Sequence, residues 1–245
     1  PGRTIEELQW LKQRYGARHF FFTDECFALA PTRRLCQQMI EKQLDIKWTC
    51  EMRFEKNLSR ELLASMRDAG CLKIVFGLES FNQRIMDFMK KGIKQEWVRR
   101  ISDDCVDLGI AVHCYIIVGF PTEKEDEALE TMNFIVENKK LHESYGFSCQ
   151  PCLFDLEKEA PIMNDPGGYG IRRIMRPSAE DLSLGFFYEV QEGMTPDEAE
   201  RLYQYVYGRI SEVVCELPFN YAMADGLLYI SRAKEGAGQA SVAAH

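Results

Sequence analysis

The sequence predicts an α/β fold in which parallel strands alternate with helices and curve into a partial, TIM-like barrel. The first observation is order: over residues 4–153, segments with helical periodicity alternate with short apolar strands, as in βα units of a parallel sheet. The second is facing: polar residues recur on one face of several strands, whereas the opposite faces are apolar. Together they predict a sheet that buries one face and presents the other to a lumen.

The predicted elements follow one another closely along the chain. Helices are expected near residues 4–15, 32–42, 59–69, 82–89, 95–108 and 123–138, each with apolar residues three and four positions apart. Strands are expected at residues 18–22, 46–53, 71–80, 110–118 and 147–153. These elements form the first predicted domain, residues 1–154.

Two further parts complete the prediction. Residues 155–232 are expected to form a mainly helical C-terminal extension, irregular to about Pro177 and helical after Thr195, where Thr-Pro-Asp-Glu is a typical helix start. Residues 233–245 are small and polar, without periodicity, and are expected to be a flexible tail.

Composition excludes several classes of partner. The formal charge of −8 and the isoelectric point near 5.2 oppose attraction to nucleic acid phosphates or anionic lipid. No apolar run approaches the roughly 20 residues that span a bilayer, and there is no secretory signal. The nine cysteines are scattered through apolar segments, as reduced thiols are. We therefore expect a cytoplasmic protein with neither a nucleic acid nor a membrane partner.

Sorting each strand by face yields the candidate lumen. The polar side chains that would line this lumen are Glu51, Arg53, Glu79, His113, Tyr115, Ser148 and Gln150. Such groups are costly to bury without partners, so a ligand-filled cavity explains them better than a packed core does. His113, one of these residues, can instead be a satisfied core histidine. Lys73, which lies on the same face, can be a residue of the barrel floor.

Residues 71–80 read CLKIVFGLES, an apolar strand that ends in glycine and acid. Gly77 and Glu79 fall on the lumen face, where the glycine opens space for a ligand, so Glu79 is the strongest functional candidate. Arg53, with Glu51 on the preceding strand, can bind a ligand or simply pair with neighbours. The Cys149-x-x-Cys152 pair is interpreted as structural, because residues three apart in a strand face opposite sides and no second pair completes a zinc site. No metal ligands are assigned.

In this order and spacing, several pieces of the sequence resemble the radical SAM superfamily, especially the branch that often carries an upstream cobalamin-binding domain. The pieces are FFFTDECF (20–27), WTCEMRF (48–54), LLASMRDAGCLKIVFGLES (62–80), MKKGI (89–93) and DLGIAVHCYIIVGFPTE (107–123). The resemblance implies a partial (β/α)6 barrel that holds S-adenosylmethionine against a [4Fe–4S] cluster. It also implies radical methylation or rearrangement of a small-molecule or peptide substrate, in some members with cobalamin.

The resemblance implies cofactor-binding residues at the strand ends. It assigns the methionyl amino group to Thr23, Asp24 and Glu25, and the ribose hydroxyls to Glu79 with Ser80.

Further along the chain, the resemblance assigns adenine to the backbone of Ile117, Val118 and Gly119. The methionyl carboxylate falls to Lys91 or its neighbour Lys90. Arg53 is included among the cofactor-binding candidates, and no catalytic residue is assigned.

One family feature is missing from the sequence. The cluster is bound by Cys-x3-Cys-x2-Cys in the family, and no cysteines here have that spacing. Either the first strand and the cluster loop precede Pro1 in a longer protein, or this relative has lost them; the start of the chain favours truncation. We expect an upstream cluster loop, and with it a cobalamin-binding domain, to be partners, and this chain alone to be inactive.

Two other functions remain open. A metal-dependent barrel hydrolase or lyase would bind a divalent ion through Asp24, Glu51, Glu79 and His113, which requires their polar atoms to converge. A non-catalytic relative would bind a nucleoside or a protein partner.

Overall fold

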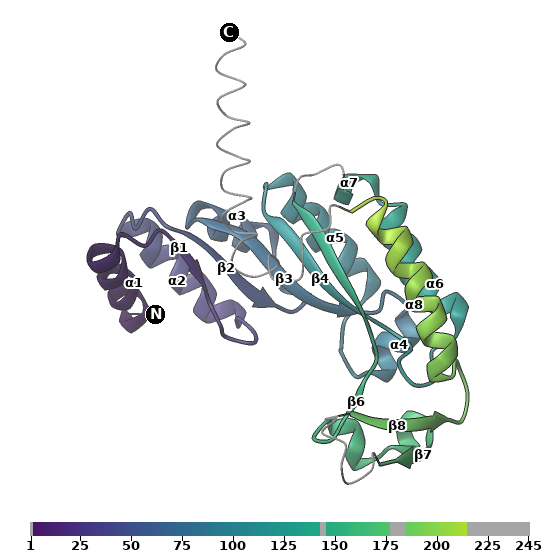
Figure 1. Ribbon diagram of the computed structural model, residues 1–245. Helices are drawn as coiled ribbons and strands as arrows, with labels where there is room; N and C mark the ends of the chain where they lie inside the picture. Colours follow the sequence, from purple (N-terminus) through teal and green to yellow (C-terminus); the bar gives the residue numbers. More distant parts are fainter. Residues whose placement is uncertain (1, 143–145, 177–184, 215–245) are drawn as a thin grey trace.

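The computed structural model describes residues 2–142, 146–176 and 185–214. Figure 1 shows a twisted sheet with helices layered on one side and a second, small sheet at the far end of the molecule. The main sheet is entirely parallel, with its strands in the order in which they occur in the sequence. They are β1 (His19–Phe21), β2 (Lys47–Met52), β3 (Cys71–Glu79), β4 (Ala111–Val118) and β5 (Phe147–Leu153). The predicted α/β fold is thus confirmed, as an open sheet with β1 and β5 at its edges.

Helix α1 precedes β1, and the other helices connect successive strands; all of them except the short α7 are predicted from the sequence. They are α1 (Gly2–Tyr15), α2 (Leu29–Glu41), α3 (Arg60–Asp68), α4 (Gln83–Phe88), α5 (Gln95–Asp107), α6 (Glu125–Val136) and α7 (Lys139–His142). Local capping defines two of the starts: the side chain of Ser59 accepts from the amide of Leu62, and that of Asn82 from the amide of Ile85. After α3, Gly70 has a φ of 95°, which ends the helix and turns the chain into β3.

The predicted apolar face of the sheet is confirmed as the core. One cluster of buried side chains contains the alternate residues of three central strands: Trp48, Cys50, Met52, Ile74, Phe76, Leu78, Val112, Cys114, Ile116 and Val118. Leu62 of α3, Val98 of α5 and Met132 of α6 belong to the same cluster. Because burying one large apolar side chain contributes about 1.5–3 kcal/mol, this shared core holds the helical layer on a single face of the sheet.

A small antiparallel sheet replaces the irregular segment expected after Asp155. Its strands are β6 (Leu156–Glu157), β8 (Gly185–Val190) and β7 (Ile171–Met175), in that spatial order, with short 3₁₀ turns η1 (Pro161–Asn164) and η2 (Gly167–Tyr169). Edge-to-face aromatic contacts join it to the end of β4, since the ring of Phe120 meets those of Phe154 and Tyr169. The segment between β6 and β7 contains Pro161, Pro166 and three glycines, which interrupt any apolar periodicity, so the sequence indicated an irregular loop here.

The C-terminal helix of the described chain, α8 (Pro196–Ser211), begins where the sequence predicts. Thr195 and Glu198 cap it reciprocally. The helix packs across α6 and β5 in Figure 1.

None of the described helices is both long and apolar enough to cross a membrane. The predicted tail, residues 233–245, lies outside the described residues, and the division of the chain at residue 154 stays a prediction.

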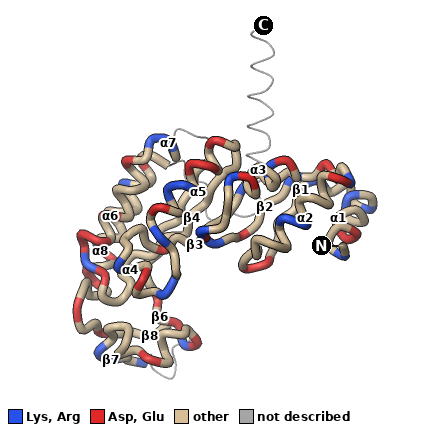
Figure 2. Tube along the Cα trace, turned by 180° about the vertical axis from the view of Figure 1, so that it is seen from behind, with Lys and Arg blue, Asp and Glu red and all other residues tan. Residues whose placement is uncertain are grey.

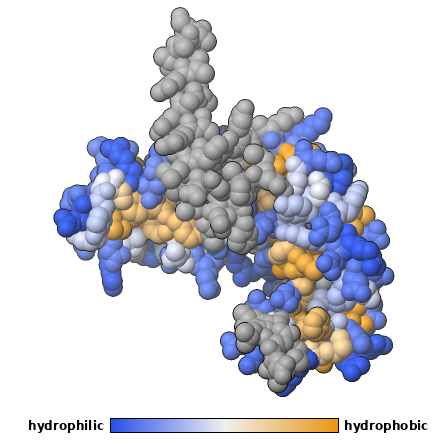
Figure 3. Space-filling model, viewed as in Figure 1, coloured by the Kyte–Doolittle hydropathy of each residue, from blue (hydrophilic) through white to orange (hydrophobic). Residues whose placement is uncertain are grey.

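Exposed apolar surface gathers at two places in the space-filling view of Figure 3: over β1 and α2, and beside the small sheet. At the first, Phe20, Phe22 and Phe27 are only partly buried against the core. The β1 edge of the main sheet therefore keeps an apolar surface in the described part of the chain.

Gly119 allows α8 to approach the end of β4. Its φ is 83°, and a β-carbon there would lie 2.4 Å from the β-carbon of Ala199. We expect Gly119→Ala to lower the free energy of unfolding by about 2–4 kcal/mol, from left-handed strain and overpacking together. Adding Ala199→Gly should recover the packing part, as measured by urea unfolding of the single and double variants. Strictly additive losses would contradict this close contact.

Candidate functional site

The strand register confirms that the predicted lumen residues share one face of the main sheet. His113 lies opposite Ser148, and Tyr115 lies between Gly77 and Gln150. Glu51 occupies the row of His113, separated from it by Val75. These side chains therefore form two adjacent rows across β2–β5, on the face that the helices leave open.

The floor of this face is buried and polar. His113 is 3% exposed, and its Nδ1 lies 2.8 Å from Oγ of Ser148, while its Nε2 has no hydrogen-bond partner. Burial, and secondarily the charge of Lys73, lowers the pKa of His113 to about 3, so the imidazole is neutral at physiological pH. A neutral ring with one unused nitrogen can hydrogen-bond a ligand in the lumen.

Carboxylates lie above this floor. Partial burial, and then the charge of Glu25, raises the pKa of Glu51. Burial, and then Glu51 and Glu79, raises the pKa of the Tyr115 phenol. The loop after β1 and the ends of β2 and β3 thus bring acids toward one region of the open face.

A bulge delivers Glu79 to this region. The register with β4 shifts between Gly77 and Glu79, and Glu79 has a φ of 63°. Its carboxylate folds back beside Gly77, since Oε1 lies 2.8 Å from where a β-carbon of that glycine would stand. The space that the glycine opens is therefore filled by Glu79 itself, rather than left free for a ligand as the sequence suggests.

Two other predicted cofactor residues are linked to that carboxylate, Lys91 directly and Arg53 through the backbone of Lys91. Nζ of Lys91 lies 2.9 Å from Oε1 of Glu79, and the Arg53 guanidinium donates to the carbonyl of Lys91. Lys90 turns elsewhere, with its ammonium 5.1 Å from the centre of the Tyr169 ring. The structure thus gathers Arg53, Glu79 and Lys91 from three different segments.

Ser80 does not join this group. It is fully buried, its Oγ lies 3.2 Å from Oγ1 of Thr131, and it accepts from the amide of Asn82. The hydroxyl is engaged with α6 and with the start of α4, on the side away from the lumen.

The residues after β1 divide between two regions. Thr23, Asp24 and Glu25 are exposed. Asp24 lines a cavity of about 290 Å³ beside α1 and α2. Glu25, by contrast, is close enough to Glu51 for its charge to raise the pKa of Glu51. The structure therefore brings Glu25 toward the lumen and leaves Asp24 on the helical side.

The turn after β4 uses its own backbone groups. The carbonyl of Val118 accepts from the amide of Phe154, and the Gly119 amide donates to Oε2 of Glu123, at 2.7 Å. Ile117, predicted with them as the adenine cradle, is half-buried beside the aromatic cluster of the small sheet. Two of the predicted adenine contacts are thus engaged within the fold.

Sequence reasoning missed the residues that hold this turn. Glu123, expected as the first residue of a helix, precedes α6, is 1% exposed and has one oxygen without a partner. Arg84 binds the carboxylate of Glu127 with two nitrogens and the carbonyl of Thr122 with a third contact of 2.8 Å. Acids before a helix are ordinarily exposed capping residues, so the sequence offers no signal for this burial.

The four side chains of the metal-dependent alternative are not gathered. Within residues 2–142, 146–176 and 185–214, no group of three or more His, Cys, Asp or Glu side chains is placed to hold a metal ion. Cys149 and Cys152 also behave as structural residues, because Cys149 packs against the core and the thiol of Cys152 donates to the carbonyl of Ile116.

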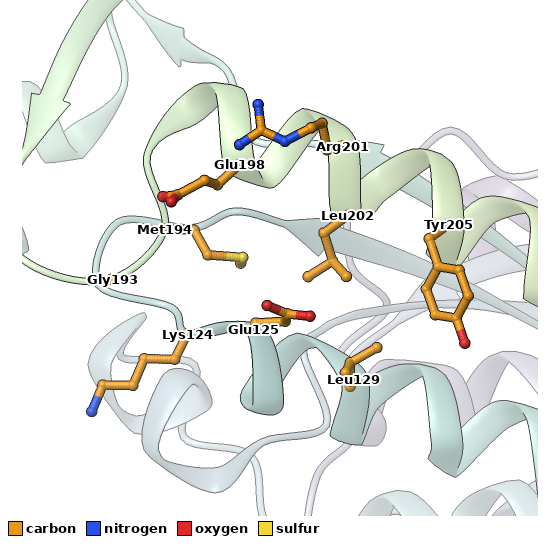
Figure 4. Close-up of a pocket in the computed structure, with 9 residues that line it drawn as sticks. All are labelled: Lys124, Glu125, Leu129, Gly193, Met194, Glu198, Arg201, Leu202 and Tyr205. Atoms are coloured by element: carbon orange, nitrogen blue, oxygen red, sulfur yellow. The ribbon is translucent and has the colours of Figure 1, made fainter.

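A separate groove of about 890 Å³ lies between α6 and α8. Figure 4 shows Leu129, Met194 and Leu202 directed into it, with Glu198 and Arg201 on α8. It contains none of the predicted site residues.

Figure 2 shows acidic and basic residues interspersed along the helices, where ion pairs such as Arg60 with Asp104 join neighbouring helices.

These observations define the class of protein: an α/β fold whose parallel sheet has helices on one face and polar residues on the other, open face. The model of the Radical SAM superfamily matches residues 1–135. The chain therefore belongs to the radical SAM superfamily.

Curated relatives cover part of the chain. An uncharacterized methyltransferase from Pyrococcus horikoshii is 32% identical over 146 residues, 59% of this chain and 31% of the relative. Anaerobic magnesium-protoporphyrin IX monomethyl ester cyclase from Rubrivivax gelatinosus is 25% identical over 134 residues, 54% of this chain and 24% of the relative. The chain thus spans about a third or less of the length of these relatives.

Solved structures agree in fold. The radical S-adenosylmethionine methyltransferase TsrM from Kitasatospora setae, with cobalamin and a [4Fe–4S] cluster bound, has a TM-score of 0.57 at 17% identity, covering 81% of this chain and 40% of that one. The cobalamin-dependent S-adenosylmethionine radical enzyme OxsB has a TM-score of 0.62 at 12% identity, covering 82% and 35%. At these identities the likeness establishes the fold alone.

The buried acid of the turn has a testable pH dependence. Burial raises the pKa of Glu123 from 4.5 to about 8, so the folded chain binds this proton more tightly than the unfolded chain does. Its contribution to stability is therefore fully present below about pH 4.5 and is lost as the pH rises through about 8.

We expect Glu123→Gln, which cannot ionise, to gain stability relative to the natural protein between about pH 5 and about pH 9. Urea unfolding at several pH values measures this gain. Glu125→Gln, at an exposed position of the same turn, is the control and should follow the natural profile. A Glu123→Gln profile parallel to that of the natural protein would contradict the assignment.

Proposed function

We propose that this chain is the S-adenosylmethionine-binding core of a radical SAM enzyme that methylates or rearranges a small-molecule or peptide substrate. The observation that carries the proposal is the delivery of Glu79 to the open face, beside the ammonium of Lys91, in a chain of this superfamily. A carboxylate at a strand end is a suitable acceptor for the two hydroxyls of a ribose. When bound, S-adenosylmethionine supplies the methyl group or the radical for the reaction.

The residues present fit part of this cofactor. Glu79 would accept from the ribose hydroxyls, while Lys91 provides positive charge beside it and Arg53 holds the backbone of Lys91. Glu25 is the acid best placed for the methionyl amino group, since its charge raises the pKa of the lumen residue Glu51 and the two carboxylates are therefore near each other. His113, Tyr115 and Gln150 would face the substrate, with the unpartnered Nε2 of His113 as a polar contact.

The residues present do not fit the iron–sulfur cluster. The sequence lacks the Cys-x3-Cys-x2-Cys spacing, and no three potential ligands converge in the described part of the chain. We propose that the cluster loop lies on a segment upstream of residue 1, beside the β1 edge, and that this chain alone is inactive. No reaction step is derived through the cluster.

Cobalamin is a further proposed cofactor. TsrM and OxsB contain it in their structures, and the Pyrococcus relative is named a methyltransferase. Methyl transfer with cobalamin is therefore the reaction that these likenesses support best, with the cobalamin-binding domain as a proposed partner. The cytoplasm is the proposed location, supported by buried thiols such as Cys36 and Cys105.

Removing the Glu79 carboxylate tests the cofactor assignment. We expect Glu79→Ala to weaken S-adenosylmethionine binding at least roughly tenfold, because charge-assisted hydrogen bonds to two hydroxyls are lost. Isothermal titration calorimetry measures the affinity, and Glu137→Ala, at an exposed position after α6, serves as the control. Unchanged affinity in Glu79→Ala would remove the ribose assignment.

Anaerobic reconstitution with iron and sulfide tests the proposed upstream ligands. We expect this chain to retain little iron, and the chain extended upstream to gain the brown absorbance of a cluster, because thiolates are the required ligands. Iron and sulfide analysis quantifies both proteins. An extended protein that stays colourless would count against a radical SAM activity.

A further inference from the structure

Lys91 contacts another predicted cofactor residue. Its Nζ lies 2.9 Å from Oε1 of Glu79, and the two side chains are largely buried, at 29% and 16% exposure. Charges partly removed from water interact more strongly than a fully exposed pair does. The pair therefore restricts the rotamers open to the Glu79 carboxylate.

The backbone of Lys91 is anchored on both sides. Its amide donates to the carbonyl of Met86 in α4, at 3.1 Å, and its carbonyl accepts from Nη2 of Arg53. The flanking residues have left-handed backbone, with φ of 57° at Lys90 and 65° at Gly92, which closes a tight turn. A residue held at both polar backbone atoms presents its side chain in a defined direction, here toward Glu79.

Glu79 occupies a position that needs support from a neighbour. Left-handed backbone is unfavourable for a residue with a side chain, and the carboxylate is folded back over Gly77. The ammonium of Lys91, 2.9 Å from Oε1, offsets the negative charge of this folded-back carboxylate and so stabilises the arrangement.

We propose that Lys91 is a positioning residue that orients Glu79 for the ribose, rather than the contact for the methionyl carboxylate that the family resemblance suggests. The inference rests on the proposed function, because it takes Glu79 as the ribose ligand. The bond to Lys91 uses Oε1, and each carboxylate oxygen has two lone pairs, so hydroxyls can bind while Lys91 stays in place. Lys91 then affects every ribose ligand, with or without a methionyl group.

The test compares two probes that differ in the methionyl group, S-adenosylmethionine and 5′-deoxyadenosine. Calorimetric titration gives the affinity of each for the natural protein and for Lys91→Met. We expect both affinities to fall by the same factor, roughly five- to tenfold, because an untethered Glu79 must be ordered on binding. Lys91→Arg, which keeps the charge, should restore most of both.

Two further variants separate positioning from general effects. Lys94→Met removes the same charge from the same loop, where Lys94 pairs with Asp87 at the surface, and should leave both affinities unchanged. Gly77→Ala places a methyl group 2.8 Å from Oε1, which displaces the end of a flexible side chain rather than backbone. It should therefore weaken both probes equally while the unfolding midpoint stays near that of the natural protein.

The outcomes distinguish the inference from the proposed function. A loss confined to S-adenosylmethionine in Lys91→Met would make Lys91 a carboxylate contact, which overturns the inference and leaves the proposed function intact. Tighter binding of both probes would mean that Lys91 competes with the ribose, and would overturn the inference too. A natural protein that binds neither probe would overturn the proposed function and, with it, this inference.

Discussion

The structure depends on the burial of one whole face of the main sheet. The strands follow one another in a single direction, and right-handed crossovers then place every connecting helix on the same side. That side carries the alternating apolar residues of β2–β4, which share one core with the helices. The other face receives no helix from these crossovers, so it can hold polar groups such as His113 and Tyr115 without disturbing the packing.

The candidate site uses a local departure from strand regularity. Alternation along β3 places Leu78 in the core and Glu79 on the open face, and the register shift after Gly77, with the left-handed backbone of Glu79, folds the carboxylate back over Gly77. The left-handed backbone of Glu79 is unfavourable by itself and is stabilised by the contacts around it, chief among them Lys91. Strain, charge and position thus coincide at the residue that the superfamily resemblance singles out.

Much of this could be predicted from the sequence, because the signals are local. Sequence patterns identified the five strands of the main sheet and the helices between them except the short α7. The two-residue period of a strand also sorted residues such as Trp48 and His113 onto opposite faces. The small sheet escaped prediction because the Pro- and Gly-rich residues 160–170 beside its strands show no apolar periodicity. Ser80 was predicted as a cofactor residue beside Glu79, but neighbours in sequence face different surroundings after a bulge, and its hydroxyl binds Thr131.

The sequence by itself determined the α/β alternation, the apolar and polar faces of the strands, and the motifs that mark the radical SAM superfamily. These properties depend on residues within a few positions of each other, whose geometry the helix and the strand dictate. Only the tertiary structure decided that Lys91 contacts Glu79 and that Glu123 is buried beneath its own turn. It also decided that Asp24 lies on the helical side of the sheet while Glu25 lies toward the lumen. Each of those outcomes depends on how distant elements pack, because burial and charge pairing arise from neighbours in space.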